Sequence, residues 1–305
     1  MRVIQKANYT GDRVIALGTF DGVHRGHQAL IRSAKSLAEE LHVPLRVCTF
    51  NRHPLEILRP EAPPELLSTI PEKAYRMQAA GVDEMELIPF DQATADLEPE
   101  AFLDRLRDNV KIRGIVAGWN YSFGRKGRGN AKMLQRDGLE HSYRVLIEPP
   151  VTLTDGTVIS SSLIRQKLKE GKTDKAAELL GFNYTLTGTV AQGKHEGHRL
   201  GFPTANIEPW RRKALPRYGV YVCLLETETE TLPAVVNIGI QPTLPSGRVT
   251  VEAHILDKNP VLYGQKVRLT MMNMLREERR FDSPEALKHQ IEQDRINAMK
   301  AFDMA

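Results

Sequence analysis

The chain has 305 residues, of which 41% are hydrophobic and 26% are charged, a composition typical of globular proteins and unlike that of disordered or fibrous chains. At roughly 100 to 200 residues per domain, this length indicates two domains, each large enough to bury a core. The excess of 42 Lys and Arg over 38 Asp and Glu, a net charge of +4, suits a phosphate-bearing ligand without requiring nucleic acid.

The sequence carries no signal for a membrane or a secretory pathway. No apolar run approaches the roughly 18 residues of a membrane-spanning helix, and the N-terminus lacks the apolar stretch of a signal peptide. The two cysteines, Cys48 and Cys223, lie in apolar, strand-like runs and are too few for a four-ligand zinc site. We therefore expect a cytoplasmic protein with no membrane partner, in which both cysteines are small buried hydrophobic residues.

Through about residue 181, short β-rich apolar runs alternate with stretches of helical period, which is typical of an α/β domain with parallel strands. The predicted strands are 14–18, 45–50, 85–89, 112–118 and 143–148. Apolar residues three and four positions apart between Ala29 and Leu41 predict a helix after the first strand. Two further helices are expected near 161–170, ending at Gly171, and near 175–180. This pattern predicts a doubly wound, Rossmann-like parallel sheet.

From residue 184 onward the pattern changes to β-rich runs at short intervals, separated by Gly and Pro turns. The runs are TLTGTV, GVYVCLL, AVVNIGI, VTVEAHIL and KVRLTMM. Such spacing predicts a small antiparallel β-barrel. A last helix is expected to begin at the cap-like segment 282–285, with Leu287, Ile291 and Ile296 on one face. We place the boundary near residue 183, which gives domains 1–183 and 184–305.

The segment 17–27, LGTFDGVHRGH, lies between the first predicted strand and the first helix, where doubly wound sheets bind nucleotides. Gly18 and Gly26 let the backbone approach a phosphate, and the helix start offers free N–H groups. His24 and His27 are three residues apart and can reach the same phosphate chain. A lone histidine here would more often cap or pack against the helix, but the pair at this turn favours phosphate binding.

Two later segments are expected at the same edge of the sheet. GWNYSFG at 118–124 follows another strand and supplies polar and aromatic walls, including Asn120. Its basic continuation at 125–129 is either a solvated loop or a phosphate contact. ISSSLIR at 159–165 places Ser161 and Arg165 at a helix start, where they could hold a triphosphate, although serine capping alone would explain half of the pattern.

A second group of chemically useful residues lies in the C-terminal half. Thr204 and Asn206 are two residues apart in the segment GFPTAN, so in an extended chain they share a face and offer the oxygen ligands that suit Mg²⁺. In VTVEAHIL, alternation separates Val251 from Glu252, which can then face a cavity and accept a proton from a hydroxyl. Taken alone, the segment GFPTAN is better explained as a Pro turn before a strand. Taken alone, Glu252 is better explained as an exposed glutamate.

Together these motifs resemble the bacterial bifunctional riboflavin kinase and FMN adenylyltransferase family over nearly the whole chain. The elements of the N-terminal half are GTFDGVHRGH, TFNRHP, PEKAYRMQAAGVD, the GWNYSFG loop, ISSSLIR and AAELLG. The resemblance implies a nucleotidyltransferase domain that transfers AMP from ATP to FMN, giving FAD and pyrophosphate. His24, His27, Asn120 and Arg165 are then the catalytic candidates. The residues it assigns to ATP binding are Gly18, Phe20, Asp21, His24, Gly26, His27, Ser161 and Arg165.

The C-terminal elements GFPTANI, VVNIGIQPT, VEAHILD and LREERRFDSPEAL resemble the riboflavin kinase module. The resemblance implies that Gly193, Thr204 and Asn206 bind ATP, that Thr204 and Asn206 lie near Mg²⁺, and that Glu252 activates the ribityl 5′-hydroxyl of riboflavin. Three departures are visible: His198 stands where family members commonly have Arg, LGFNY replaces LGRPY, and Ser162 stands for Thr.

The leading interpretation is therefore an enzyme that makes FMN from riboflavin and then FAD from FMN, with ATP and Mg²⁺. One alternative is an FMN adenylyltransferase whose kinase-like domain is inactive, with His198 as the suspect position. Another is a flavin-responsive regulator that binds nucleic acid, which leaves the motifs unexplained. We expect the small molecules ATP, riboflavin and FMN as partners, no nucleic acid, and at most a transient homo-oligomer.

Overall fold

The structure, a computed structural model, describes residues 1–4, 11–108, 110–191, 202–240 and 249–303. The chain divides into two compact units, Met1–Ser161 and Ser162–Ala305. The helices expected near 161–170 and 175–180 belong to the second unit by this division, because the chain there packs against the barrel. The Thr173 hydroxyl donates to the Met272 carbonyl over 2.6 Å, and the Arg217 N–H donates to the Leu168 carbonyl over 2.8 Å.

The first unit contains a six-stranded parallel sheet with the order β1-β4-β3-β2-β5-β6. Its strands are β1 (Arg2–Ile4), β2 (Asp12–Leu17), β3 (Leu45–Phe50), β4 (Glu84–Ile88), β5 (Lys111–Gly118) and β6 (Arg144–Glu148). Its helices are α1 (Arg25–Glu40), α2 (Leu55–Leu58), α3 (Ile70–Ala79), α4 (Gln92–Ala95), α5 (Pro99–Asp108) and α6 (Ala131–Glu140), with a short 3₁₀ turn η1 (Arg125–Gly127). The predicted doubly wound sheet is confirmed; only the three-residue edge strand β1 had not been predicted.

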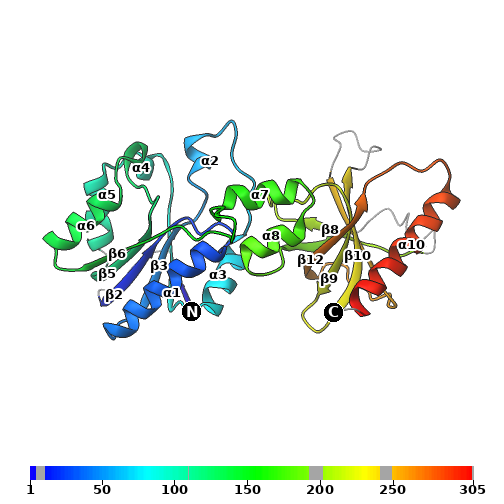
Figure 1. The fold of residues 1–305 in the computed structure, drawn as a ribbon, viewed down its shortest axis with the longest axis horizontal. Coiled ribbons are helices and arrows are strands. Elements are labelled where there is room, and N and C mark those ends of the chain that lie inside the picture. Colours follow the sequence, from blue (N-terminus) through cyan, green and yellow to red (C-terminus); the bar gives the residue numbers. More distant parts are fainter. Residues whose placement is uncertain (5–10, 109, 192–201, 241–248, 304–305) are drawn as a thin grey trace. The chain divides into compact units, whose positions relative to one another are not determined.

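Helices cover both faces of this sheet (Figure 1), and apolar side chains of the strands pack against them. Val14 and Ala16 of β2 pack with α1 and with Met77 of α3, whereas Ile15 and Leu17 pack with α5 and with Leu134 of α6. Strands buried on both faces are typical of parallel sheets with crossover helices. Cys48 and Cys223 are both buried, as predicted.

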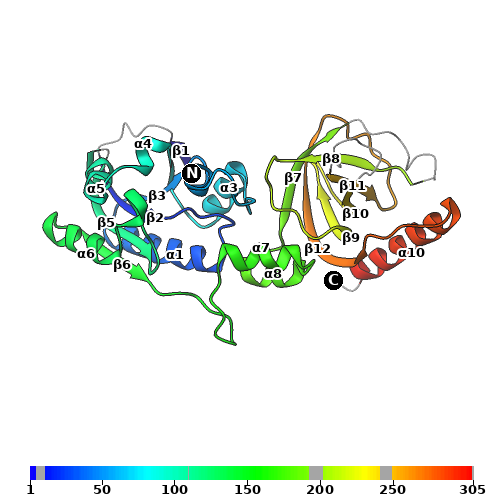
Figure 2. The same ribbon diagram turned by 90° about the horizontal axis from the view of Figure 1, so that it is seen from above.

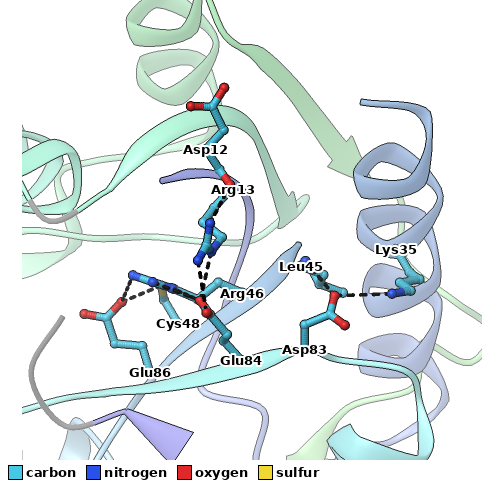
Figure 3. Close-up of polar contacts among 9 residues, drawn as sticks. All are labelled: Asp12, Arg13, Lys35, Leu45, Arg46, Cys48, Asp83, Glu84 and Glu86. Atoms are coloured by element: carbon cyan, nitrogen blue, oxygen red, sulfur yellow. Dashed lines mark hydrogen bonds and ion pairs between the residues drawn. The ribbon is translucent and has the colours of Figure 1, made fainter. Parts of the chain in front are cut away.

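A network of buried charges interrupts the apolar face on β2, β3 and β4 (Figure 3). The Arg46 side chain has no exposed surface; its Nε donates to Glu84 Oε2 over 2.9 Å, and its Nη1 donates to Glu86 Oε2 over 3.3 Å. Arg13 donates to both oxygens of Glu84, at 3.0 and 3.1 Å. Burial alone would raise the pKa of Glu84, but the hydrogen bonds and charges of the two arginines outweigh it and lower that pKa below 4.5.

Arg46→Ala is expected to lower the free energy of unfolding of this unit by about 3 to 5 kcal/mol, because the buried Glu84 and the partly buried Glu86 lose their shared partner. Arg113→Ala, which removes an exposed ion pair to Asp12, is the matched control and should cost about 1 kcal/mol or less. Urea unfolding followed by Trp119 fluorescence in a Trp210→Phe background would measure both. Equal losses in the two variants would contradict the prediction.

The same network predicts how stability depends on acid. The folded pKa of Glu84 is depressed, so its contribution is complete above its ordinary pKa of 4.5 and is lost as the pH falls through the folded value. Wild-type protein should therefore lose stability below about pH 4.5 more steeply than Arg46→Ala does. Parallel acid titrations of the unfolding midpoint test this, and superimposable slopes would refute it.

The second unit is a closed barrel with the strand order β10-β11-β8-β7-β12-β9, preceded by two helices and followed by one (Figure 2). The strands are β7 (Thr185–Ala191), β8 (Ala205–Pro209), β9 (Gly219–Glu226), β10 (Thr231–Ile240), β11 (Val249–Ile255) and β12 (Lys266–Glu277). The helices are α7 (Ser161–Lys169), which begins at the last residue of the first unit, α8 (Thr173–Leu180) and α10 (Pro284–Asp303). The predicted barrel and terminal helix are confirmed; β8 had been expected only as an extended segment.

The face of α10 that packs against the barrel differs from the predicted one. Ile296 is 38% exposed, whereas Asp294 and Ala298 are buried. Asp294 accepts hydrogen bonds from Nε and Nη2 of Arg276 on β12, at 2.8 to 3.1 Å. The prediction was wrong for Ile296 because hydropathy treats an aspartate as a surface residue, whereas an arginine on the facing strand allows it to be buried.

Candidate functional site

A pocket of about 510 Å³ opens at the carboxyl ends of β2 and β5 in the first unit. These neighbouring strands form the switch point of the sheet, because the chain continues from β2 to β3 on one side and from β5 to β6 on the other. Doubly wound sheets bind their ligands at such a point. The lining comes from the ends of β2, β3 and β5, from the start of α1, and from the segment 148–161.

Two histidines stand at the start of α1 beside this pocket. His24 is the N-cap, and its Nδ1 accepts the backbone N–H of His27 over 3.3 Å. The two rings stack, with centroids 3.7 Å apart and planes 17° apart. A Cβ on Gly26 would lie 3.2 Å from the His24 ring, so glycine permits the ring's position. The pair therefore sits where the helix dipole and free N–H groups favour an anion.

Side chains of β3 and α3 donate hydrogen bonds to the backbone of the turn that carries the histidines. The Thr19 carbonyl accepts the buried Lys73 ammonium over 2.7 Å and the Thr49 hydroxyl over 3.0 Å. Phe20 and Val23 are buried with positive φ angles of 50° and 43°, a conformation that non-glycine residues adopt only when their surroundings enforce it. Lys73 and Thr49 thus help to fix the backbone just before the histidine pair.

Two further contacts tie the turn to neighbouring segments. The Asp21 carboxylate accepts the backbone N–H groups of Leu67 and Ser68, at 3.0 and 3.1 Å. The Ser161 hydroxyl donates to the Asp21 carbonyl over 2.8 Å, so Ser161, the last residue of the first unit, is joined to the same turn. Asp21 holds the turn through these contacts and is not among the described residues that line the pocket.

Burial and neighbouring charge keep His27 electrically neutral at physiological pH. Burial, the nearby His24 and the charge of Lys73 hold the pKa of His27 well below 6.5. Burial also lowers the pKa of Lys73 to about 8, although the charge of Asp21 acts in the opposite direction. Nδ1 of His27 is buried without a hydrogen-bond partner among the described residues. Because Nδ1 is buried, Nε2 is the nitrogen of the neutral His27 ring that can form a hydrogen bond with a ligand.

The structure gathers most, but not all, of the predicted site residues of the first unit. Those that line the pocket are Gly18, His24, Gly26, His27, Asn120 and Ser161. Phe20 is fully buried beneath the His27 ring, with centroids 5.2 Å apart. Arg165 lies one turn into α7, in the second unit. Phe20 and Asp21 thus support the turn, and the role expected for Arg165 stays a prediction.

Sequence analysis assigned no role to several residues that shape the site. His53 lines the pocket next to an apolar wall made of Phe50, Pro54, Leu55, Leu58, Phe90 and Phe102. Lys73 lies under the turn. The motifs TFNRHP and PEKAYRMQAAGVD contain His53 and Lys73, but their sequences show no spacing relation to the histidine pair, because they approach it only in the folded sheet.

In the barrel, strand register brings two of the predicted kinase residues together. Glu252 on β11 lies directly opposite Asn206 on β8 and, on its other side, opposite Asn237 on β10. Residues directly opposite in an antiparallel pair point to the same face. Val251 and Ala253 are buried and fill the interior, so Glu252, Asn206 and Asn237 share the outer face. Asn237 was not predicted, because nothing local links it to Glu252.

Other predicted kinase residues are placed only in part. Thr204 is half-buried just before β8, and the adjacent Pro203 carbonyl lies 2.9 Å from Nδ1 of His254 on β11. This hydrogen bond, donated by His254, ties the PTAN segment to the strand that carries Glu252. Gly193 and His198 lie outside the described residues.

Comparisons with known proteins find matches for both halves of the chain. A model of the FAD synthetase family matches residues 6–163, and a model of the riboflavin kinase family matches residues 180–302. The bifunctional riboflavin kinase/FMN adenylyltransferase of Bacillus subtilis (strain 168) is 34% identical over 95% of this chain and 92% of the relative. The proteins of the same name from Escherichia coli (strain K12) and Pseudomonas fluorescens are 34% and 35% identical, covering 95% and 92% of this chain and 93% and 90% of the relatives.

A solved structure has the same fold throughout. A Streptococcus pneumoniae crystal structure titled as a macrolide-efflux protein is 31% identical, with a TM-score of 0.87, and the match covers 96% of this chain and 97% of that one. Within the described residues, no helix has the length and apolar character needed to cross a membrane. From its family-model matches and its relatives, the chain belongs to the family of bifunctional riboflavin kinase/FMN adenylyltransferases.

Proposed function

We propose that the pocket of the first unit transfers AMP from ATP to the phosphate of FMN, and that the barrel phosphorylates riboflavin to FMN. The observation that carries this proposal is the stacked histidine pair at the start of α1, at the switch point of the sheet, in a chain whose two halves match the two family models. We place the functional boundary near residue 183.

In the first unit, a phosphate oxygen of FMN attacks the α-phosphorus of ATP, and the bond from that phosphorus to the bridging oxygen of pyrophosphate breaks. Negative charge grows on the leaving pyrophosphate. Nδ1 of His24 accepts a backbone N–H, so a neutral His24 carries its proton on Nε2 and can donate it in a hydrogen bond. His24, His27 and the start of α1 then stabilise the developing charge without a covalent intermediate.

In the barrel, Glu252 accepts the proton of the riboflavin 5′-hydroxyl as that oxygen attacks the γ-phosphorus of ATP and ADP leaves. Glu252 lies directly opposite Asn206, and His254 on the same strand contacts Pro203. Both contacts support this assignment, because they keep Glu252 near the PTAN segment. The hydroxyl of Thr204 and the carboxamide of Asn206 are hard oxygen donors of the kind that Mg²⁺ prefers. When bound, Mg²⁺ would offset charge on the nucleotide phosphates.

The test is product analysis by chromatography after riboflavin, ATP and Mg²⁺ are mixed with the purified protein. FMN should appear first and FAD later, and FMN supplied directly should also give FAD. FAD from FMN without FMN from riboflavin would show that the kinase-like domain is inactive. Nucleic-acid binding that persists at moderate salt, without turnover of either flavin, would instead favour the regulator. A cytoplasmic location and a transient homo-oligomer stay predictions.

A further inference from the structure

The loop between β5 and α6 is a tightly built hairpin at the mouth of the adenylyl-transfer pocket. Phe123 and Gly129 exchange two backbone hydrogen bonds, at 3.1 and 2.9 Å, which close the loop at its base. Gly124 has a φ of 68° and packs so closely on Pro99 that a Cβ would lie 2.7 Å from the Pro99 Cα. The Arg125 N–H donates to the Leu97 carbonyl over 2.6 Å. The path of the loop is therefore fixed by local contacts.

The three basic residues of this loop are arranged in two different ways. Arg125 and Arg128 both turn to Glu98, at 3.6 and 3.0 Å. Lys126, between them, lines the pocket and has no ion pair or side-chain hydrogen bond to any residue that the structure describes. Its backbone is left-handed, with φ 55° and ψ 24°, an uncommon conformation for lysine. In this hairpin, Lys126 therefore differs from Arg125 and Arg128, whose charges are already paired with Glu98.

The pocket lining contains few charged side chains, and Lys126 is one of them. Among the described lining residues it is the only lysine or arginine, and Glu148 is the only carboxylate. The histidine His27 is neutral, for the reasons given above. Yet the reaction proposed for this pocket brings together two substrates that both carry phosphate groups. An ammonium with three donors and no partner among the described residues is well suited to bind such a group.

We propose that Lys126 binds a phosphate group of the adenylyl-transfer substrates, a role not shared by Arg125 and Arg128. This inference rests on the proposed function of the pocket. The phosphate is either the nucleophilic phosphate of FMN or the pyrophosphate portion of ATP, and both present the same oxygens to the ammonium. Kinetics distinguish the two phosphates, because loss of the contact raises the KM of only one substrate.

The test compares Lys126→Asn with Arg125→Gln and Arg128→Gln in the full chain. Asparagine tolerates a left-handed backbone, so Lys126→Asn removes the charge without adding strain. Loss of a charged hydrogen bond should lower kcat/KM for FAD formation roughly 10- to 100-fold, whereas each arginine variant should stay within about threefold. Lys126→Arg should retain most of the rate. A higher KM for FMN alone indicates the flavin phosphate, and a higher KM for ATP indicates the pyrophosphate portion.

Two measurements keep the result interpretable. Melting temperature and FMN formation from riboflavin are recorded on each preparation, and Lys126→Gly repeats the test if the asparagine variant folds poorly. Equal losses in all three loop variants, or no loss in Lys126→Asn, would overturn the proposal. If the wild-type protein makes no FAD, the proposed function fails by itself. Calorimetric titration with pyrophosphate and with FMN then decides on Lys126: weaker binding of either by Lys126→Asn supports its role, and unchanged binding of both refutes it.

Discussion

His27→Ala is expected to lower FAD formation from FMN by about 10² to 10³, equivalent to roughly 2.7 to 4 kcal/mol, because it removes a donor aimed at growing negative charge. The ring is neutral, stacks on His24, and stands at the start of α1 beside the pocket. Such a donor matters more in the transition state than in the bound substrate, so the loss should appear in kcat as well as in kcat/KM. Steady-state kinetics with supplied FMN measures it.

A purely structural role for His27 makes a different prediction. The ring also packs against Phe20, so its removal could lower the melting temperature while turnover per folded molecule stays unchanged. FMN formation from riboflavin, measured on the same preparation, should be retained in either case. His27→Gln, which keeps an N–H donor on a longer side chain, should recover part of the FAD-forming rate. An unchanged adenylyl-transfer rate in His27→Ala would refute the catalytic role.

Glu252→Gln is expected to lower FMN formation from riboflavin by roughly 10² or more, since the amide keeps the shape of the side chain but cannot accept the hydroxyl proton. FAD formation from supplied FMN should stay near normal, because that reaction uses the other pocket. Chromatographic assays of both products from one preparation provide the measurement.

The barrel offers a matched control for this substitution. Glu230 is partly buried just before β10 and pairs with Lys258 over 2.7 Å, a surface ion pair. Glu230→Gln should leave both activities unchanged, because such pairs contribute little to stability. If Glu252→Gln and Glu230→Gln behaved alike, or if Glu252→Gln reduced both reactions together, Glu252 would be a structural residue of β11.

The elements of this fold follow closely from local sequence. The strands of the sheet, the barrel runs and the helix starts depend on patterns only a few residues long, which a single chain displays directly. Ser283 shows this well: it was expected near a helix start, and its hydroxyl accepts the N–H of Ala286 over 3.1 Å. The alternation around Glu252 is equally local, and its burial pattern agrees with the expectation. The histidine pair was likewise visible, because both residues belong to one turn.

Tertiary structure decided which residues meet across long separations in sequence. The register that sets Asn237 and Asn206 on either side of Glu252, and the reach of Lys73 to Thr19, join segments that no local pattern connects. Burial of a charge depends on its partner in space, and so the apolar pattern of α10 favoured Ile296 where the fold buries Asp294 on Arg276. The basic loop shows the same limit: its sequence contains three similar cations, and only the position of Glu98 separates the two paired arginines from Lys126 in the pocket.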